Sequence, residues 1–231
     1  MNRTVSFVKF AAVLAAIATT ISGSPAQAKN SPASERSALT ITVKIYDYTR
    51  ADRKSLLKAE NQAAAIFASA NVNVNWVDCP TSHAVASEYP NCTAVEEAQR
   101  YTLTLLPNKM VTSASKSQDS LGSVSDCSTG TCTASVYYER IAAAAGGNNA
   151  PAAVLVGRVM AREIGQLILG ANSDSRSGIL KAAWSTDDLG WDPSHTMAFT
   201  VEQTHRLKTR LAAEQPLEAQ TRATAGLSGQ E

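Results

Sequence analysis

The sequence has few histidines, no excess of charge of either sign and no long hydrophobic run in its main body. Its 21 Lys and Arg residues nearly balance its 20 Asp and Glu residues, so no basic surface for nucleic acid is expected. A membrane-spanning helix needs about 20 consecutive apolar residues, and the sequence contains no such run. These absences argue against a nucleic-acid-binding protein and against a protein held in a membrane by a helix.

The start of the chain has the pattern of a cleavable secretory signal peptide. Arg3 and Lys9 form a basic start, residues 10–21 are mostly apolar, and residues 26–28 (Ala-Gln-Ala) fit a cleavage site before Lys29. Cleavage there leaves 19 of the 21 basic residues against 20 acidic ones. We therefore expect an exported protein, periplasmic or extracellular, that has no membrane association after cleavage.

The four cysteines fall into two close pairs, Cys79 with Cys92 and Cys127 with Cys132. In an oxidising compartment such pairs are expected to form two local disulfides. Four cysteines allow three pairings, and proximity alone selects this one. A zinc knuckle is the alternative, but neither pair has C-x-x-C spacing and only His83 lies nearby.

The spacing of apolar residues predicts an α/β fold. Residues 39–45 alternate between apolar and polar, residues 52–70 repeat at helical spacing, and residues 72–76 alternate again. A strand, a helix and a strand in this order place two parallel strands side by side, with the helix across one face. The later expectations are a strand at 101–106, a long surface loop at 111–135, an edge strand at 136–137, a loop around 146–149, a helix at 152–169 that Gly170 ends, and a helix that runs from a capping box at Thr200 and Gln203 to about 211.

The composition suits a single domain. After the signal peptide at 1–28 we expect a flexible polar lead-in at 29–38, one domain at 39–211 and a disordered polar tail at 212–231. Tryptophans 76, 184 and 191 are interpreted as core or turn anchors rather than as a ligand cage.

The most informative stretch lies in and after the helix at 152–169. Arg162 and Gln166 are spaced i and i+4, so they share one helix face, and Glu163 follows the first of them. Gly170 ends the helix and Asp174 comes four residues later. A turn then follows, formed by Ser177, Gly178, Ile179 and Leu180. This stretch resembles the zinc-binding segment of the zincin metallopeptidases, and is most similar to small secreted bacterial metzincin-like members, with the histidines replaced.

The resemblance implies a role for each of these positions. In H-E-x-x-H two imidazoles on one helix face bind zinc, and the Glu takes a proton from the zinc-bound water. Here Arg162 and Gln166 fill the helical ligand positions, Glu163 the position of a vestigial general base, and Asp174 the third-ligand position. Residues 177–180 correspond to the turn beneath the metal. The implied fold is a zincin-like α/β (α+β) domain, in which a small mixed sheet packs on helices, one of them the degenerate zinc-site helix.

The residues at these positions do not suit zinc. A guanidinium stays protonated and only donates hydrogen bonds, Gln is a poor ligand, and a catalytic zinc uses three protein ligands. We therefore expect no cofactor, although the family that the chain resembles uses zinc, and we expect Arg162 to form a salt bridge with Asp174 beside Gln166. The implied function is that of an inactive, exported pseudo-peptidase that acts by binding a peptide or a protein. Its oligomeric state is not predicted.

Three alternatives remain open. The chain is an active zinc peptidase with atypical ligands if two of its histidines, His83, His195 and His205, rebuild the site, although His195 and His205 are more simply surface or loop residues. It is otherwise an unrelated exported α/β domain with a structural role. On the third reading Arg158, Arg162 and Gln166, spaced i, i+4 and i+8, form only the solvated stripe of an amphipathic helix.

Overall fold

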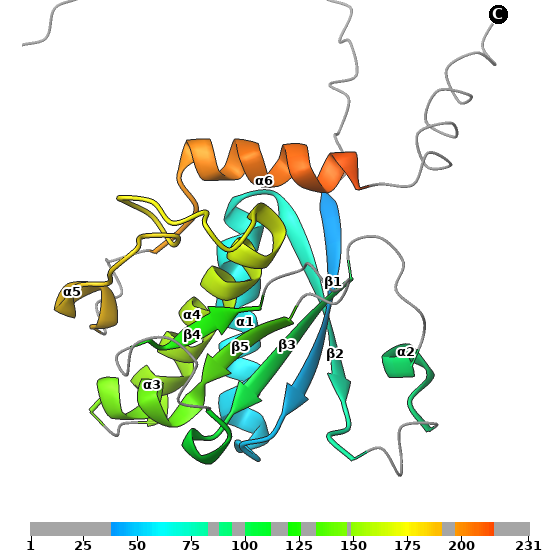
Figure 1. Cartoon of the computed structure of the whole chain (residues 1–231), viewed down its shortest axis with the longest axis vertical. Helices are drawn as coiled ribbons and strands as arrows, with labels where there is room; N and C mark the ends of the chain where they lie inside the picture. The colour runs from blue at the N-terminus through cyan, green and yellow to red at the C-terminus, as the bar shows by residue number, and fades with distance from the viewer. Residues whose placement is uncertain are drawn as a thin grey trace, which may run out of the picture. The chain divides into compact units, whose positions relative to one another are not determined.

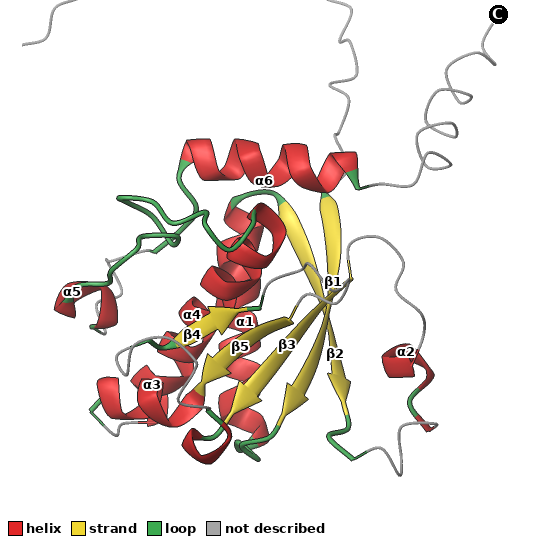
Figure 2. Cartoon of the chain, in the orientation of Figure 1, coloured by secondary structure: helices red, strands yellow, loops and turns green. Residues whose placement is uncertain are grey.

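The computed structural model describes residues 38–82, 88–93, 100–111, 120–125, 133–146, 149–190 and 197–214. Within them a five-stranded sheet has the order β2-β1-β3-β5-β4 (Figures 1 and 2). Two long helices, α1 and α4, lie against one face of the sheet, and α6 runs across one end of its strands (Figure 1). The fold class is therefore the mixed sheet packed on helices that the sequence predicts.

The first unit is the predicted strand, helix and strand. β1 (Leu39–Asp47) and β2 (Val72–Cys79) pair in parallel, with Ile41 opposite Val74, and α1 (Arg53–Ser69) connects them. The α1 helix begins where predicted, because the Asp52 side chain accepts a hydrogen bond from the Ser55 N–H at 3.0 Å.

The middle of the chain differs from the prediction in two ways. The expected long loop at 111–135 contains β4 (Gly122–Val124), and the expected edge strand is part of β5 (Thr133–Tyr137), which lies inside the sheet. β5 pairs in parallel with β3 (Arg100–Leu106), while β4 pairs antiparallel to β5 and forms the edge. A three-residue strand of Gly, Ser and Val has too few apolar positions to show the alternation that identifies a strand.

Most of the other helices follow β5 in the sequence. After β5 come α3 (Tyr138–Ala144) and the long helix α4 (Asn149–Leu169), and the chain ends its described part with α6 (Val201–Ala213). Shorter pieces are α2 (Pro90–Thr93), the 3₁₀ turn η2 (Asn108–Met110) and α5 (Thr186–Leu189). The predicted capping box of α6 is present, with Thr200 and Gln203 exchanging hydrogen bonds. Gly170 has φ 101°, as expected for a left-handed helix end.

The core lies between the sheet and the helices. Its largest fully buried side chains come from β1, α1, β3, β5, α3, α4 and the turn before α5: Ile41, Ile45, Phe67, Leu103, Leu105, Tyr137, Ile141, Leu155, Met160, Ile164, Ile179 and Leu180. Among the described helices none is long and apolar enough to cross a membrane.

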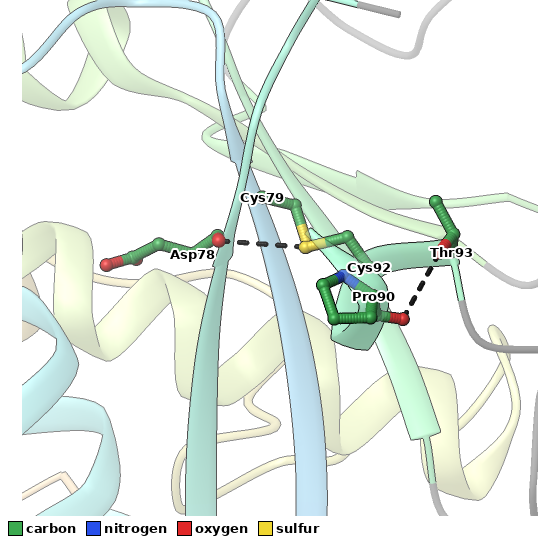
Figure 3. Close-up of a disulfide and its surroundings, with 5 residues drawn as sticks. All are labelled: Asp78, Cys79, Pro90, Cys92 and Thr93. Carbon is green, nitrogen blue, oxygen red and sulfur yellow. Dashed lines mark hydrogen bonds between the residues drawn. A yellow bond between two sulfur atoms is a disulfide. The ribbon is translucent and has the colours of Figure 1, made fainter. Parts of the chain in front are cut away.

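One of the two predicted disulfides is present. Cys79, at the end of β2, is bonded to Cys92 in α2, with the two Cα atoms 5.7 Å apart (Figure 3). The bond attaches α2 to the sheet edge and agrees with an oxidising compartment. The pair Cys127 and Cys132 lies outside the described residues, as do the predicted signal peptide, the predicted lead-in up to residue 37 and the predicted tail from residue 215.

Candidate functional site

The α4 helix is buried on nearly all sides, because α1, α3, α6 and the sheet all pack against it. Arg158 is 6 % exposed and Gln166 is 4 % exposed, although both are polar. The interpretation of Arg158, Arg162 and Gln166 as a solvated stripe is therefore wrong. These polar side chains face protein, and each needs partners there.

Arg162, Gln166 and Asp174 converge on one oxygen atom. The Asp174 Oδ1 accepts a hydrogen bond from Arg162 Nη2 at 2.9 Å and from Gln166 Nε2 at 2.6 Å. The predicted salt bridge between Arg162 and Asp174 is thus present, with Gln166 bonded beside it. Arg162 Nη1 also donates to Glu163 Oε1 at 2.6 Å. We call these four residues the α4 network.

Glu163 is the most deeply buried member of the α4 network, with its side chain 1 % exposed. It lies against the edge strand, because a Cβ at Gly122 of β4 would stand 2.7 Å from the Glu163 Cγ. Only glycine at position 122 leaves room for this carboxylate between α4 and the sheet. The missed strand β4 therefore positions one of the predicted site residues.

The predicted turn at 177–180 packs under α4. Ile179 and Leu180 are fully buried, and a Cβ at Gly165 of α4 would stand 3.1 Å from the Leu180 Cδ2. Gly178 has φ 71°, and Gln203 of α6 donates to the Ser177 carbonyl at 2.8 Å. The turn belongs to the long loop between α4 and α6, which is interrupted by α5 (Figure 2).

The part of this loop around α5 is bonded to α4 by a charged group that the sequence did not indicate as functional. Arg158 donates to the carbonyls of Asp188 and Gly190 at 3.0 and 3.1 Å, and Lys181 bonds the Asp188 carboxylate at 2.6 Å. Burial lowers the pKa of the Arg158 guanidinium, and the nearby Asp188 carboxylate opposes that shift. Ser185 and Asp188 form a capping box for α5, a pattern that is readable in the sequence.

A cavity of about 720 Å³ opens beside the α4 network. β4 and the two residues before it supply one wall, α3 and α4 supply others, and residues 182–184 with Leu189 line the remaining side. The apolar lining residues are Leu121, Ala143, Ala144, Val159, Ala182, Ala183, Trp184 and Leu189. Trp184, interpreted from the sequence as an anchor only, is half-buried and lines this cavity.

A second group of charged side chains, one arginine and two acids, lies where β2 ends and α1 begins. Arg53 Nη1 is 2.5 Å from the Asp78 carboxylate and 3.9 Å from Glu60 Oε1. Burial, and then the charge of Asp78, raise the pKa of Glu60 to about 7, while Arg53 opposes the shift. We call Arg53, Glu60 and Asp78 the α1 cluster; nothing in the sequence pattern singled it out.

The α4 network does not fit the zinc that the sequence resemblance implies. The guanidinium of Arg162 and the amide nitrogen of Gln166 both act as donors toward Asp174, so neither offers a lone pair to a metal. Across the described ranges, no group of three or more His, Cys, Asp or Glu side chains is placed to hold a metal ion. His205 is exposed on α6, as expected for a surface histidine, whereas His83 and His195 lie outside the described residues.

The fold and the site together define a mixed α/β domain with a buried charged network on its long helix, next to a cavity. Among solved structures, the chain is similar to the crystal structure of archaemetzincin from Methanopyrus kandleri, with 14 % sequence identity and a TM-score of 0.44. The similarity covers 77 % of this chain and 98 % of that one. No protein-family model matches the sequence, and no curated protein matches it.

Proposed function

We propose that this chain is an exported zincin-like pseudo-peptidase, which has lost its metal site and acts by binding a peptide or protein segment. The main support for the proposal is that Arg162 and Gln166 both donate a hydrogen bond to Asp174 Oδ1. These are the three positions that the sequence resemblance assigns to metal ligands, and they meet at one point. The guanidinium of Arg162 is thus a cation that the chain itself supplies at this point.

The cavity beside the network supports binding as the remaining activity. Its volume of about 720 Å³ lies within the range of small-molecule and peptide pockets. β4 is an edge strand, and an extended peptide can pair with such a strand through main-chain hydrogen bonds. The disulfide between Cys79 and Cys92 supports export.

Metal analysis of the purified mature protein tests the loss of the site. After dialysis the wild-type protein should contain substoichiometric zinc and should cleave no peptide, because two of the three ligand positions carry donors. A stoichiometric zinc ion together with peptide cleavage would favour the active peptidase with atypical ligands.

A double substitution tests whether the geometry is that of a former zinc site. Arg162→His with Gln166→His places two imidazoles at i and i+4 beside Asp174, and this variant should bind stoichiometric zinc. Thr209→His is the matched control, since it adds a second imidazole four residues after His205 on the exposed face of α6. If the folded double variant binds zinc no better than this control, the unrelated α/β domain becomes the better interpretation.

A further inference from the structure

Asp174 is the most accessible member of the α4 network. Its side chain is 46 % exposed, compared with 17 % for Arg162 and 1 % for Glu163, and it lines the cavity. Its Oδ1 accepts both bonds from Arg162 and Gln166. Within the described part of the chain no hydrogen bond reaches Oδ2, so this oxygen is available to a ligand.

The accessible carboxylate of Asp174 favours a cationic ligand. Its Oδ1 lies 2.9 Å from Arg162 Nη2, and its side chain remains 46 % exposed where it lines the cavity. Arg140 also lines the cavity, but its Nη1 donates to the Ser120 carbonyl at 3.0 Å and its guanidinium lies 4.8 Å from the centre of the Tyr137 ring. These contacts hold Arg140 at the β4 side of the cavity. A cation therefore finds its counter-charge at Asp174.

The walls of the cavity suit an aliphatic stem. Val159, Trp184 and Leu189 line it together with alanines from α3 and from residues 182–183. Lysine and arginine side chains combine an aliphatic stem, which packs on apolar surface, with a charged head that needs a polar partner. A side chain of this kind matches both the apolar lining and the free carboxylate oxygen.

We infer that the cavity binds a lysine or arginine side chain of a peptide segment, with its cationic head on Asp174 Oδ2 and its stem along Val159, Trp184 and Leu189. This inference rests on the proposed binding function and names the class of ligand. The contact is a charge-assisted hydrogen bond between the ligand's N–H and the Asp174 carboxylate.

Calorimetric titration with four blocked pentapeptides tests the inference on the wild-type protein. The peptides are acetyl-Ala-Ala-X-Ala-Ala-amide, with X as lysine, acetyl-lysine, norleucine or glutamate. The lysine peptide should bind at least about tenfold more tightly than the other three, because only it supplies a cation on an aliphatic stem. Acetyl-lysine keeps the aliphatic stem and loses the charge but is longer, whereas norleucine keeps the stem without the amine, so the two peptides together separate charge from size.

Asp174→Asn assigns the preference to one residue. This variant keeps an oxygen acceptor for Arg162 and Gln166 and removes the negative charge, so the lysine peptide should lose about tenfold in affinity while the norleucine peptide changes little. Asp187→Asn is the matched control, since Asp187 is an exposed acid on α5 outside the cavity lining, and it should leave all four affinities unchanged.

Two different failures can be told apart. If the peptides bind but lysine and glutamate bind equally, or if Asp174→Asn has no selective effect, the inference is overturned and peptide binding stands. If none of the four peptides binds at millimolar concentration, the proposed binding function fails and the inference fails with it. Since the lysine and acetyl-lysine comparison uses only the wild-type protein, the inference stays testable even if Asp174→Asn does not fold.

Discussion

The α4 network and the α1 cluster share three kinds of residue but differ in how the arginine meets the glutamate. Each contains one arginine, one deeply buried glutamate and one aspartate that is about half exposed, and the α4 network adds Gln166. In the α4 network the arginine side chain is itself only 17 % exposed, and its Nη1 lies 2.6 Å from the Glu163 carboxylate. In the α1 cluster the Arg53 side chain is 64 % exposed, and its Nη1 stays 3.9 Å from Glu60.

The difference shows what a buried carboxylate requires. Glu163 receives a direct hydrogen bond at 2.6 Å from a cation that is buried with it. The cation near Glu60 stays largely in solvent beyond hydrogen-bonding distance, and burial raises the pKa of Glu60 to about 7. An arginine nearby is therefore not sufficient, because the guanidinium must also be brought out of water and into contact.

The largest effect is expected from removing each arginine. Arg162→Ala removes the cation that lies 2.6 Å from the buried Glu163 carboxylate and should lower the free energy of unfolding by about 3 to 5 kcal/mol. Arg53→Ala, the matched control, removes a mostly exposed partner and should cost less than about 1 kcal/mol. Urea unfolding of both variants measures the difference, and equal losses would show that burial of the arginine is not what separates the two regions.

The second-largest expected effect is a pH dependence of protein stability that arises from Glu60 in the α1 cluster. The pKa of Glu60 is about 7 in the folded protein against its usual 4.5, so between these values the folded state binds more protons than the unfolded state. The contribution of Glu60 to stability should therefore be greatest below about pH 4.5 and fall as pH rises through 7, by at most about 3 kcal/mol.

Substitution of Glu60 isolates this contribution. Glu60→Gln removes the titrating group and should flatten the loss of stability between about pH 5 and about pH 8, as measured by chemical unfolding across that range. Glu202→Gln changes an exposed glutamate in the first turn of α6 and should leave the slope as it is in the wild-type protein. An unchanged slope in Glu60→Gln would assign the pH dependence to other groups.

A smaller effect is expected from the disulfide next to the α1 cluster. Cys79 follows Asp78 directly, and its bond to Cys92 closes a loop with a sequence separation of 13 (Figure 3). Cys79→Ser with Cys92→Ser should cost about 2 to 3 kcal/mol. The cost of Arg162→Ala should be the same in this background, because the two regions share no residue; a changed cost would mean that they are coupled.

The pairing of Cys127 with Cys132 stays a prediction. Peptide mapping under non-reducing conditions should recover these two cysteines in one linked fragment, separate from the fragment that contains Cys79 and Cys92. A fragment that joins a member of one pair to a member of the other would contradict both the prediction and the bond in the structure.

The smallest effect is the coupling within the α4 network. In a double-mutant cycle, Arg162→Ala with Asp174→Ala should destabilise less than the sum of the single changes, by about 1 kcal/mol, because Asp174 is 46 % exposed. The cycle of Arg162→Ala with Asp187→Ala is the control and should show no coupling. Absence of coupling in the first cycle would mean that the contact at 2.9 Å does not contribute to stability.

The regular elements could be predicted because their apolar spacing repeats over enough residues. The strand β1 alternates between apolar and polar residues over positions 39–45, and the apolar residues of α1 repeat at helical spacing along its 17 residues. The three residues of β4 do not, and β4 is fixed by pairing with β5 and by the space that Glu163 needs beside Gly122. These contacts join residues that are far apart in the sequence, so no local sequence pattern predicts the strand β4.

Part of the site could be predicted for a different reason. The spacing of Arg162 and Gln166 fixes their common helix face, and the resemblance to a zinc site indicated that Asp174 returns to it. The α1 cluster could not be found in this way, since Arg53, Glu60 and Asp78 belong to two elements and form no motif. The same holds for Arg158, whose partners at residues 188 and 190 are backbone carbonyls that any residue supplies.

The guanidinium at the centre of the α4 network is attached to the chain by covalent bonds, so it cannot dissociate. A metal centre is filled or empty according to the concentration of free ion around it, and a host or a competitor that withholds the ion can switch it off. Here every molecule carries the cation that meets Glu163 and Asp174 from the moment it folds. The contacts that this cation makes beside the cavity are therefore independent of the concentration of any free ion.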